Sequence, residues 1–197
     1  MPPIPPLTQA LMLICTAVFC LNIFLPLEIW FALWPLHTGM FWPWQPVSYA
    51  FLHGSMFHLF FNMLGLWMFG SELERLWGQR RYAMFLLACA ITAAVTQLLL
   101  TYLTGSNSPT VGASGALYGL LLAFGMLFPN RVIMPLFPPI PMKARTFVIV
   151  FGAIELLLGL YGGSGVAHFA HLGGMLGGFL MIRYWRGQLP FAASRRR

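Results

Sequence analysis

The sequence predicts an all-α polytopic membrane protein built as a bundle of six transmembrane helices. Composition is the first observation behind this prediction: 59% of the 197 residues are hydrophobic and only 8% are charged, with a mean hydropathy of +0.77. A soluble domain would carry about a quarter charged residues. The surplus apolar surface needs lipid as its solvent, so we expect one membrane-embedded domain over residues 1–197.

The second observation is a series of apolar stretches along the chain. They cover approximately residues 7–25, 54–72, 82–103, 113–128, 146–161 and 166–184. Most approach the roughly 20 residues that a helix needs to cross the hydrocarbon core. The fourth and fifth are shorter, so we expect those helices to begin or end inside the membrane. The first lacks a basic start and a small-residue cleavage site, which favours a retained helix over a removed signal peptide.

The third observation is the placement of the basic residues. All of them lie at the end of the second, fourth or sixth stretch or after it: Arg75, Arg80, Arg81, Arg131, Lys143, Arg145, Arg183, Arg186, Arg195, Arg196 and Arg197. The positive-inside rule then places both termini in the cytoplasm. We expect an integral multi-pass protein of the plasma (inner) membrane, with the lipid bilayer as its surroundings. Because these charges are scattered at the ends of spans, the net charge of +7 does not indicate nucleic-acid binding.

Two connections between the stretches are long. Residues 26–52 lie on the outer side and hold four of the seven tryptophans, which favours a position at the lipid headgroups. An ordinary aromatic belt without a further role explains these tryptophans equally well. Residues 130–143 lie on the cytoplasmic side and are rich in proline, which predicts a stiff linker.

The thiols and acids restrict the chemistry. Cys15, Cys20 and Cys89 lie within apolar runs and are expected to be packing residues, without a disulfide framework or metal spacing. The acids are all glutamates, and the chain contains no aspartate. That absence excludes the aspartyl class of intramembrane protease.

Polar residues gather at one depth. His53, His58 and Asn62 enter the second stretch from the outer side, Ser114 opens the fourth, and His171 lies near the outer end of the sixth. Polar groups at membrane depth are energetically expensive and tend to face a cavity or one another. We therefore expect these side chains to converge in the outer leaflet.

Small residues allow the helices that carry these groups to approach closely. Glycines four residues apart permit close packing in lipid, and the fourth and sixth stretches contain such pairs: Gly115 with Gly119, Gly173 with Gly177, and Gly174 with Gly178. Packing alone would account for them. We also expect the packing to bring the Ser114 hydroxyl to an imidazole.

Four motifs together resemble those of the rhomboid family of intramembrane serine proteases. The spacing of His53, His58 and Asn62 is similar to the family's H-x4-H-x3-N, and a GxSG motif begins at Gly112. An A-H-x-x-G-x3-G motif ends at Gly178, and the E-x3-G element is formed by residues 74–78. The resemblance covers nearly the whole chain and implies the six-span fold.

One position departs from the family pattern. Gln45 follows Trp44 where many members have arginine, which puts the usual polar contacts of the outer loop in question. That loop is not catalytic in the family.

The resemblance implies a Ser–His dyad. Ser114 would be the nucleophile and His171 the base, with Tyr118 packed against the imidazole in place of an aspartate. His58 and Asn62 would join the Ser114 backbone N–H in stabilising the oxyanion. Gly112 and His53 would support the site, and the positive end of the fourth helix would face the developing charge.

His171 is preferred to His168 as the base because of the glycines that follow it. His171 has glycine three and seven residues later, whereas His168 has His171 and Met175 at those positions.

The function implied is hydrolysis of peptide bonds in or near the transmembrane segments of single-span membrane proteins. A substrate helix must open before its peptide bonds can be cut, so helix-weakening residues near the outer face are expected in substrates. No cofactor is implied, and the sequence carries no signal for an oligomeric state.

Several alternatives remain. An inactive rhomboid-like protein could bind spans without cutting them, although the retained Ser114 and His171 argue against it. A transporter or channel would call for paired charges or inverted repeats, which the sequence lacks. A metal site could be built from His53, His58, His168 and His171, but no carboxylate or cysteine is expected to join them, so no metal is predicted. Glu155 is either a neutral, hydrogen-bonded packing residue or part of a substrate gate, and packing is favoured.

Overall fold

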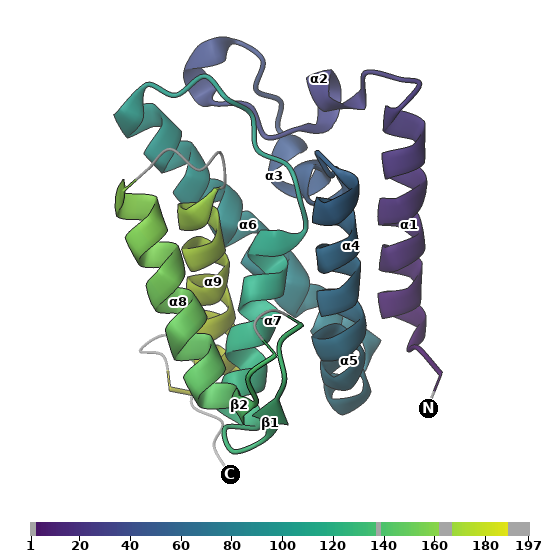
Figure 1. The fold of residues 1–197 in the computed structure, drawn as a ribbon. Coiled ribbons are helices and arrows are strands. Elements are labelled where there is room, and N and C mark those ends of the chain that lie inside the picture. The colour runs from purple at the N-terminus through teal and green to yellow at the C-terminus, as the bar shows by residue number, and fades with distance from the viewer. Residues whose placement is uncertain (1–2, 137–138, 162–166, 189–197) are drawn as a thin grey trace.

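The computed structural model describes residues 3–136, 139–161 and 167–188, and these are mostly helical. The long helices, each overlapping one predicted stretch, are α1 (Pro6–Asn22), α4 (Met56–Gly65), α6 (Gln79–Thr104), α7 (Ser114–Leu127), α8 (Ala144–Tyr161) and α9 (His168–Trp185). They form a bundle in which α1 begins and α9 ends at the same end (Figure 1). Arg195, Arg196 and Arg197, which entered the prediction of orientation, lie outside the described residues.

By length and composition, α6 and α8 are long and apolar enough to cross a membrane, and α1 and α7 are shorter apolar helices. The fourth stretch is short, as expected: α7 has 14 residues. The prediction of a short fifth helix was wrong, because α8 has 18 residues. It begins at Ala144, directly after a short hairpin, and the Ala144 N–H donates to the Arg131 carbonyl at 2.8 Å.

That hairpin is a departure from the all-α prediction. Strands β1 (Val132–Ile133) and β2 (Met142–Lys143) pair antiparallel within the segment expected to be only a stiff linker. The prolines of this segment lie between the two strands rather than in them. Each paired residue therefore keeps the backbone N–H that a ladder needs.

The second stretch continues beyond its predicted end. After α4 the chain passes through a π-helical turn, η3 (Leu66–Gly70), and continues as α5 (Ser71–Trp77). Ser55 caps the start of α4 by accepting the His58 N–H at 3.1 Å, the usual role of serine at this position. The turn from α5 into α6 is made by Gly78 at φ +75°.

Glu74 explains the E-x3-G element. Its buried carboxylate accepts the backbone N–H groups of Leu7 and Thr8, at 3.0 and 2.7 Å, and the Thr8 hydroxyl at 2.7 Å. The first N–H groups of a helix have no partner within that helix. Glu74 supplies one for α1 and fixes the start of α1 against α5.

Residues 26–52 contain the short elements α2 (Leu27–Phe31), η1 (Leu36–Thr38), α3 (Gln45–Ser48) and η2 (Tyr49–Phe51). Gln45 organises it: the fully buried side chain donates to the Trp30 and Met40 carbonyls, at 3.3 and 3.0 Å, and accepts the Trp34 N–H at 3.2 Å. Glutamine thus supplies the polar contacts that the missing arginine put in question.

The same segment holds the loop that leads into α7. Leu33 and Thr110 exchange both backbone hydrogen bonds, at 2.9 and 3.0 Å, and the Gly112 N–H donates to the Tyr49 carbonyl at 2.9 Å. In Figure 1 the chain after α6 turns back into the bundle before α7 begins. The start of α7 is therefore set below the end of α6.

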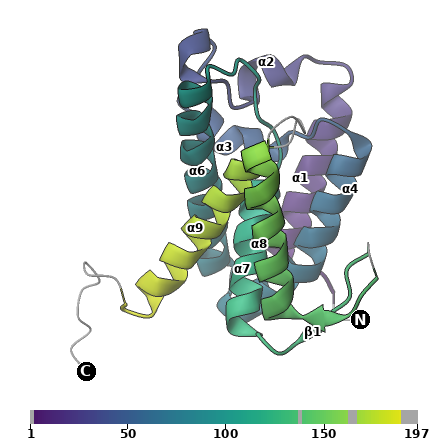
Figure 2. The same cartoon turned by 60° about the vertical axis from the view of Figure 1, so that its left-hand side comes forward.

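Glycines bring α9 against two helices at once. A Cβ added at Gly174 would lie 1.8 Å from the Gly115 carbonyl oxygen of α7, and one at Gly178 would lie 3.1 Å from that of Gly119. The other pair faces α6, where Gly173 lies against Thr96. The predicted close packing is confirmed, and α9 lies beside both α7 and α8 in the two views (Figures 1 and 2).

Candidate active site

Ser114 is the first residue of α7. Gly112, two residues earlier, has φ +121°, in a region that side chains other than glycine rarely adopt. A Cβ at Gly112 would also lie 2.6 Å from the His58 ring. Glycine is required here for both reasons, and the turn it makes directs the chain into α7 with Ser114 at the helix start.

His171 meets Ser114. Its Nε2 lies 2.8 Å from Ser114 Oγ, across a separation of 57 residues in sequence. Gly174, one turn after His171, closely approaches Gly115, directly after Ser114, and this contact sets the distance between the two backbones. With a lone pair on Nε2, the imidazole can accept the serine proton, which is the first step of nucleophilic catalysis by serine.

Tyr118 stacks on this imidazole. The two ring centroids are 4.3 Å apart and the planes differ by 8°. Tyr118 lies one turn after Ser114 on α7, so a single helix carries both the hydroxyl and the aromatic plane against which His171 rests. This is the contact expected of Tyr118 from its sequence position.

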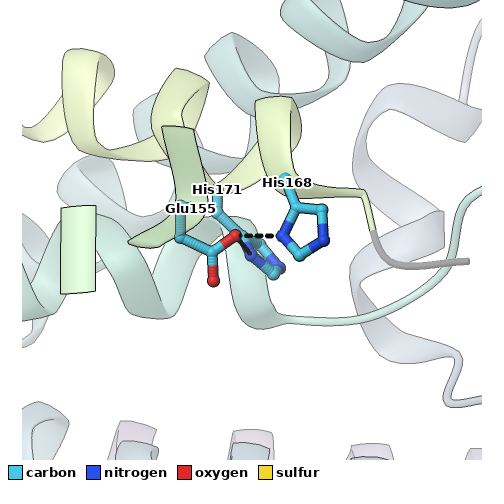
Figure 3. Close-up of side chains that lie close together, drawn as sticks. All are labelled: Glu155, His168 and His171. Atoms are coloured by element: carbon cyan, nitrogen blue, oxygen red, sulfur yellow. Dashed lines mark hydrogen bonds and ion pairs between the residues drawn. The ribbon is translucent and has the colours of Figure 1, made fainter. Parts of the chain in front are cut away.

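The far side of His171 faces Glu155, which the sequence analysis did not place in the site. Glu155 Oε2 lies 2.9 Å from His171 Nδ1 and 2.6 Å from His168 Nδ1 (Figure 3). The His168 contact is a hydrogen bond. The His171 contact is at ion-pair distance, but Nδ1 of His171 makes no aligned hydrogen bond. The Tyr118 hydroxyl donates to the other carboxylate oxygen.

Glu155 is buried and hydrogen-bonded, as expected of a packing residue, but its partners are Tyr118 and His168 beside His171. One expectation about acids was wrong. A carboxylate joins His168 and His171, contrary to the expectation that none would. The missing aspartate suggested that no acid serves the imidazole, but a glutamate on a different helix reaches it.

These groups include a set that could hold a metal ion. One ligand atom from each of Glu155, His168 and His171 lies within 4.8 Å of the others. His53 and His58 do not join this set. Their rings contact each other edge-on, with centroids 5.1 Å apart. The four-histidine metal site considered from the sequence is thus divided into two separate pairs.

His58 and Asn62 each line a cavity that Ser114 also lines. His58 packs on Gly112, and the Asn62 side-chain amide donates one hydrogen to the His58 carbonyl at 2.7 Å. A second amide hydrogen remains available, because an asparagine amide has two. His53 is buried behind His58, where it supports the ring.

Ser114 is reached by two cavities of different character. One, of about 560 Å³, is lined mainly by apolar side chains of α4, α7 and α8, among them Phe61, Leu117 and Phe151. The other, of about 830 Å³, has both apolar and polar residues in its lining, and the polar ones include His58, Gln97 and His171. The first suits an apolar polypeptide segment, and the second offers hydrogen-bond partners to water.

The sequence did contain a signal for Glu155. It is a lone acid within an apolar stretch, and ionisable groups at such positions pair with one another. His168 and His171 are three residues apart on one helix face. The simplest interpretation would have been that Glu155 is a partner shared by His168 and His171 on the neighbouring helix.

Comparisons with known proteins match this chain to one family and to curated relatives. Residues 40–187 match the family described as "Rhomboid domain". The chain is 28% identical over 186 residues to "Rhomboid protease GlpG" of Yersinia pestis (strain Pestoides F) and of Yersinia pseudotuberculosis serotype O:3 (strain YPIII), covering 91% of this chain and 62% of each relative. It is 31% identical over 138 residues to "Rhomboid protease GluP" of Bacillus subtilis (strain 168), covering 69% of this chain and 25% of that protein. The chain thus spans less than two thirds of the length of these relatives.

Proposed function

Because this chain belongs to the rhomboid family, we propose that it is an intramembrane serine endopeptidase that hydrolyses peptide bonds in or near transmembrane segments through Ser114 and His171. The observation that carries the proposal is the 2.8 Å contact between Ser114 Oγ and His171 Nε2. The relatives named above are described as proteases, which favours catalysis over binding alone.

In the first half-reaction, the Ser114 oxygen attacks the peptide carbonyl carbon while its proton passes to His171 Nε2. The tetrahedral intermediate carries a negative charge on the former carbonyl oxygen. His171 then gives its proton to the departing amine, leaving an acyl group on Ser114. In the second half-reaction, water loses a proton to the same nitrogen and attacks the ester carbon. The ester C–O bond then breaks, His171 returns the proton to the Ser114 oxygen, and the acid product leaves.

The charged intermediate needs donors on the side away from His171. The Ser114 backbone N–H lies at the start of α7, where N–H groups have no partner within the helix. Asn62 and His58 line the cavities beside Ser114 and are the proposed side-chain donors. Removing one such donor lowers kcat by roughly 10²- to 10³-fold in enzymes of this type.

The two cavities suggest how substrate and water reach the serine. An apolar segment of a single-span substrate would occupy the cavity bounded by Phe61, Leu117 and Phe151. Water would arrive through the larger cavity, whose lining includes His58, Gln97 and His171. Substrates with Gly or Pro near the outer face are favoured, because the helix must open to expose a peptide bond.

The topology belongs to the same proposal. Six spans with both termini in the cytoplasm would place the Ser114 end of α7 in the outer leaflet of the plasma (inner) membrane. The proposal treats residues 1–197 as a single rhomboid domain that needs no cofactor.

The test uses purified protein in lipid vesicles with a single-span substrate and, separately, a fluorophosphonate that labels activated serines. We expect the wild type to cut and to be labelled, and Ser114→Ala and His171→Ala to lose both activities. Ser48→Ala is a matched control, because Ser48 lies on α3 and donates to the Phe31 carbonyl. A folded wild type that neither cuts nor reacts with the probe would refute the proposal and leave a binding protein.

A further inference from the structure

The Glu155 carboxylate is buried among groups from two neighbouring helices. The residue is 6% exposed, and its oxygens face Tyr118 on α7 and His168 and His171 on α9. Burying a carboxylate costs free energy unless it is hydrogen-bonded or paired. A packing residue at this place in an apolar helix could have been leucine, so the acid calls for an explanation.

We propose that Glu155 is a positioning residue for the hydrolysis, which extends the dyad to a group of three: Ser114, His171 and Glu155. This inference rests on the proposed function. The carboxylate acts on His171, whose Nδ1 lies 2.9 Å from Oε2, and does not touch the substrate. The acidic third member, Glu155, lies on α8, and the base, His171, lies on the next helix along the chain.

The role follows from the proton transfer. When His171 takes the Ser114 proton at Nε2, both ring nitrogens carry hydrogen and the ring becomes positive. A carboxylate beside Nδ1 stabilises that charge and favours the tautomer whose Nε2 is free to accept the proton. Glu155 itself takes no proton, and the pair of imidazolium and carboxylate remains neutral.

Tyr118 and His168 hold the carboxylate in place. The Tyr118 hydroxyl donates to Oε1 and His168 Nδ1 contacts Oε2 at 2.6 Å. Tyr118 also stacks on His171, so one side chain fixes the base and the acid relative to each other. The His171 contact is not yet an aligned hydrogen bond, and such contacts often tighten only when substrate is bound.

The variant that tests this is Glu155→Gln, which removes the charge at nearly constant volume. The assays are vesicle cleavage, which separates kcat from KM, and the rate of fluorophosphonate labelling at Ser114. We expect kcat and the labelling rate to fall together by roughly 10²-fold or more; an amide in place of the acid of a serine triad lowers kcat by roughly 10⁴-fold. KM and the melting temperature should stay near the wild-type values.

Two further variants sharpen the test. Glu155→Asp restores the charge one methylene farther away and should recover about tenfold or more of the lost kcat. Glu72→Gln is the matched control, because Glu72 pairs with the exposed Arg131 away from the site, and its kcat should equal the wild type. The chelator EDTA should leave the wild-type rate unchanged.

Several results would overturn the inference: a kcat for Glu155→Gln within about threefold of the wild type, a loss confined to KM, or no recovery with Glu155→Asp. Loss of wild-type activity in EDTA and its return with Zn²⁺ would assign Glu155, His168 and His171 to a metal site instead.

If Glu155→Gln fails to fold, Tyr118→Phe decides. It keeps the stacked ring but loses the hydroxyl that holds the carboxylate, and an unchanged kcat would contradict the inference. Ser114→Ala keeps the two proposals apart. If Ser114→Ala still cuts, the protease proposal itself fails; if it is inactive while Glu155→Gln is fully active, only the role of Glu155 fails.

Discussion

Gly174→Ala should separate the serine from its base without touching either residue. The added Cβ would lie 1.8 Å from the Gly115 carbonyl oxygen and 2.6 Å from its carbonyl carbon, and real Cβ atoms essentially never approach other atoms more closely than 3.0 Å. Neither neighbour is a flexible side chain, so the backbones of α7 and α9 must part. Relieving the shorter contact requires a shift of about 1.2 Å, which a packed interior cannot absorb locally.

That shift acts one helical turn from His171. Added to the 2.8 Å between His171 Nε2 and Ser114 Oγ, it takes the pair to about 4 Å, beyond hydrogen-bond range. A misplacement of about 1 Å costs roughly 10² in rate, so kcat should fall by about that factor or more. The same clash should lower the free energy of unfolding by about 1–3 kcal/mol.

The assay is cleavage of a single-span substrate in vesicles, with thermal unfolding followed in parallel. Gly152→Ala is the matched control: its nearest contact would be the flexible end of Met175 at 3.3 Å, and its activity should stay close to the wild type. If Gly174→Ala folds and keeps kcat within about threefold of the wild type, the link between helix packing and catalytic geometry is wrong.

Gly112→Ala should lower kcat by roughly 10² or more, because the residue has φ +121° and its new Cβ would displace the His58 ring; the fluorophosphonate labelling rate measures this, and normal labelling would contradict it. Glu74→Gln should lower the free energy of unfolding by about 1–3 kcal/mol, because an amide cannot accept all three hydrogen bonds that the carboxylate receives from Leu7 and Thr8. Denaturant titration checks it against Glu72→Gln, an exposed pair worth about 0–1 kcal/mol, and equal losses in the two variants would refute the assigned role.

The helices could be predicted from apolar length, because lipid requires continuous runs of apolar residues and each long helix overlaps such a run. The close packing of α9 could be predicted as well, since glycines four residues apart have few other uses in an apolar helix. The contact of Ser114 with His171 needed a third kind of information, namely that both lie at the same end of their helices. Charge placement supplied it.

Glu155 could not be placed so easily. A lone acid in an apolar helix indicates that a partner is needed. The direction in which the Glu155 side chain points depends on the rotation of α8 about its axis, and the sequence does not fix that rotation because apolar residues occupy the other faces of the helix. The hairpin before α8 was missed for a different reason: it has only two residues in each strand, too few for an alternating pattern. The sequence identified Gln45 only as a departure from the family pattern. Its structural role depends on hydrogen bonds to three backbone groups, and only the fold brings those groups to it.

The backbone pairing of Leu33 and Thr110 joins residues 26–52 to the loop before Ser114. Three tryptophans of residues 26–52, namely Trp30, Trp42 and Trp44, contact one another and are 43–53% exposed. Because two hydrogen bonds join this segment to the loop before Ser114, we expect a displacement of the segment to move that loop. We therefore predict that the cleavage rate depends on bilayer thickness and passes through an optimum in vesicles of graded acyl-chain length.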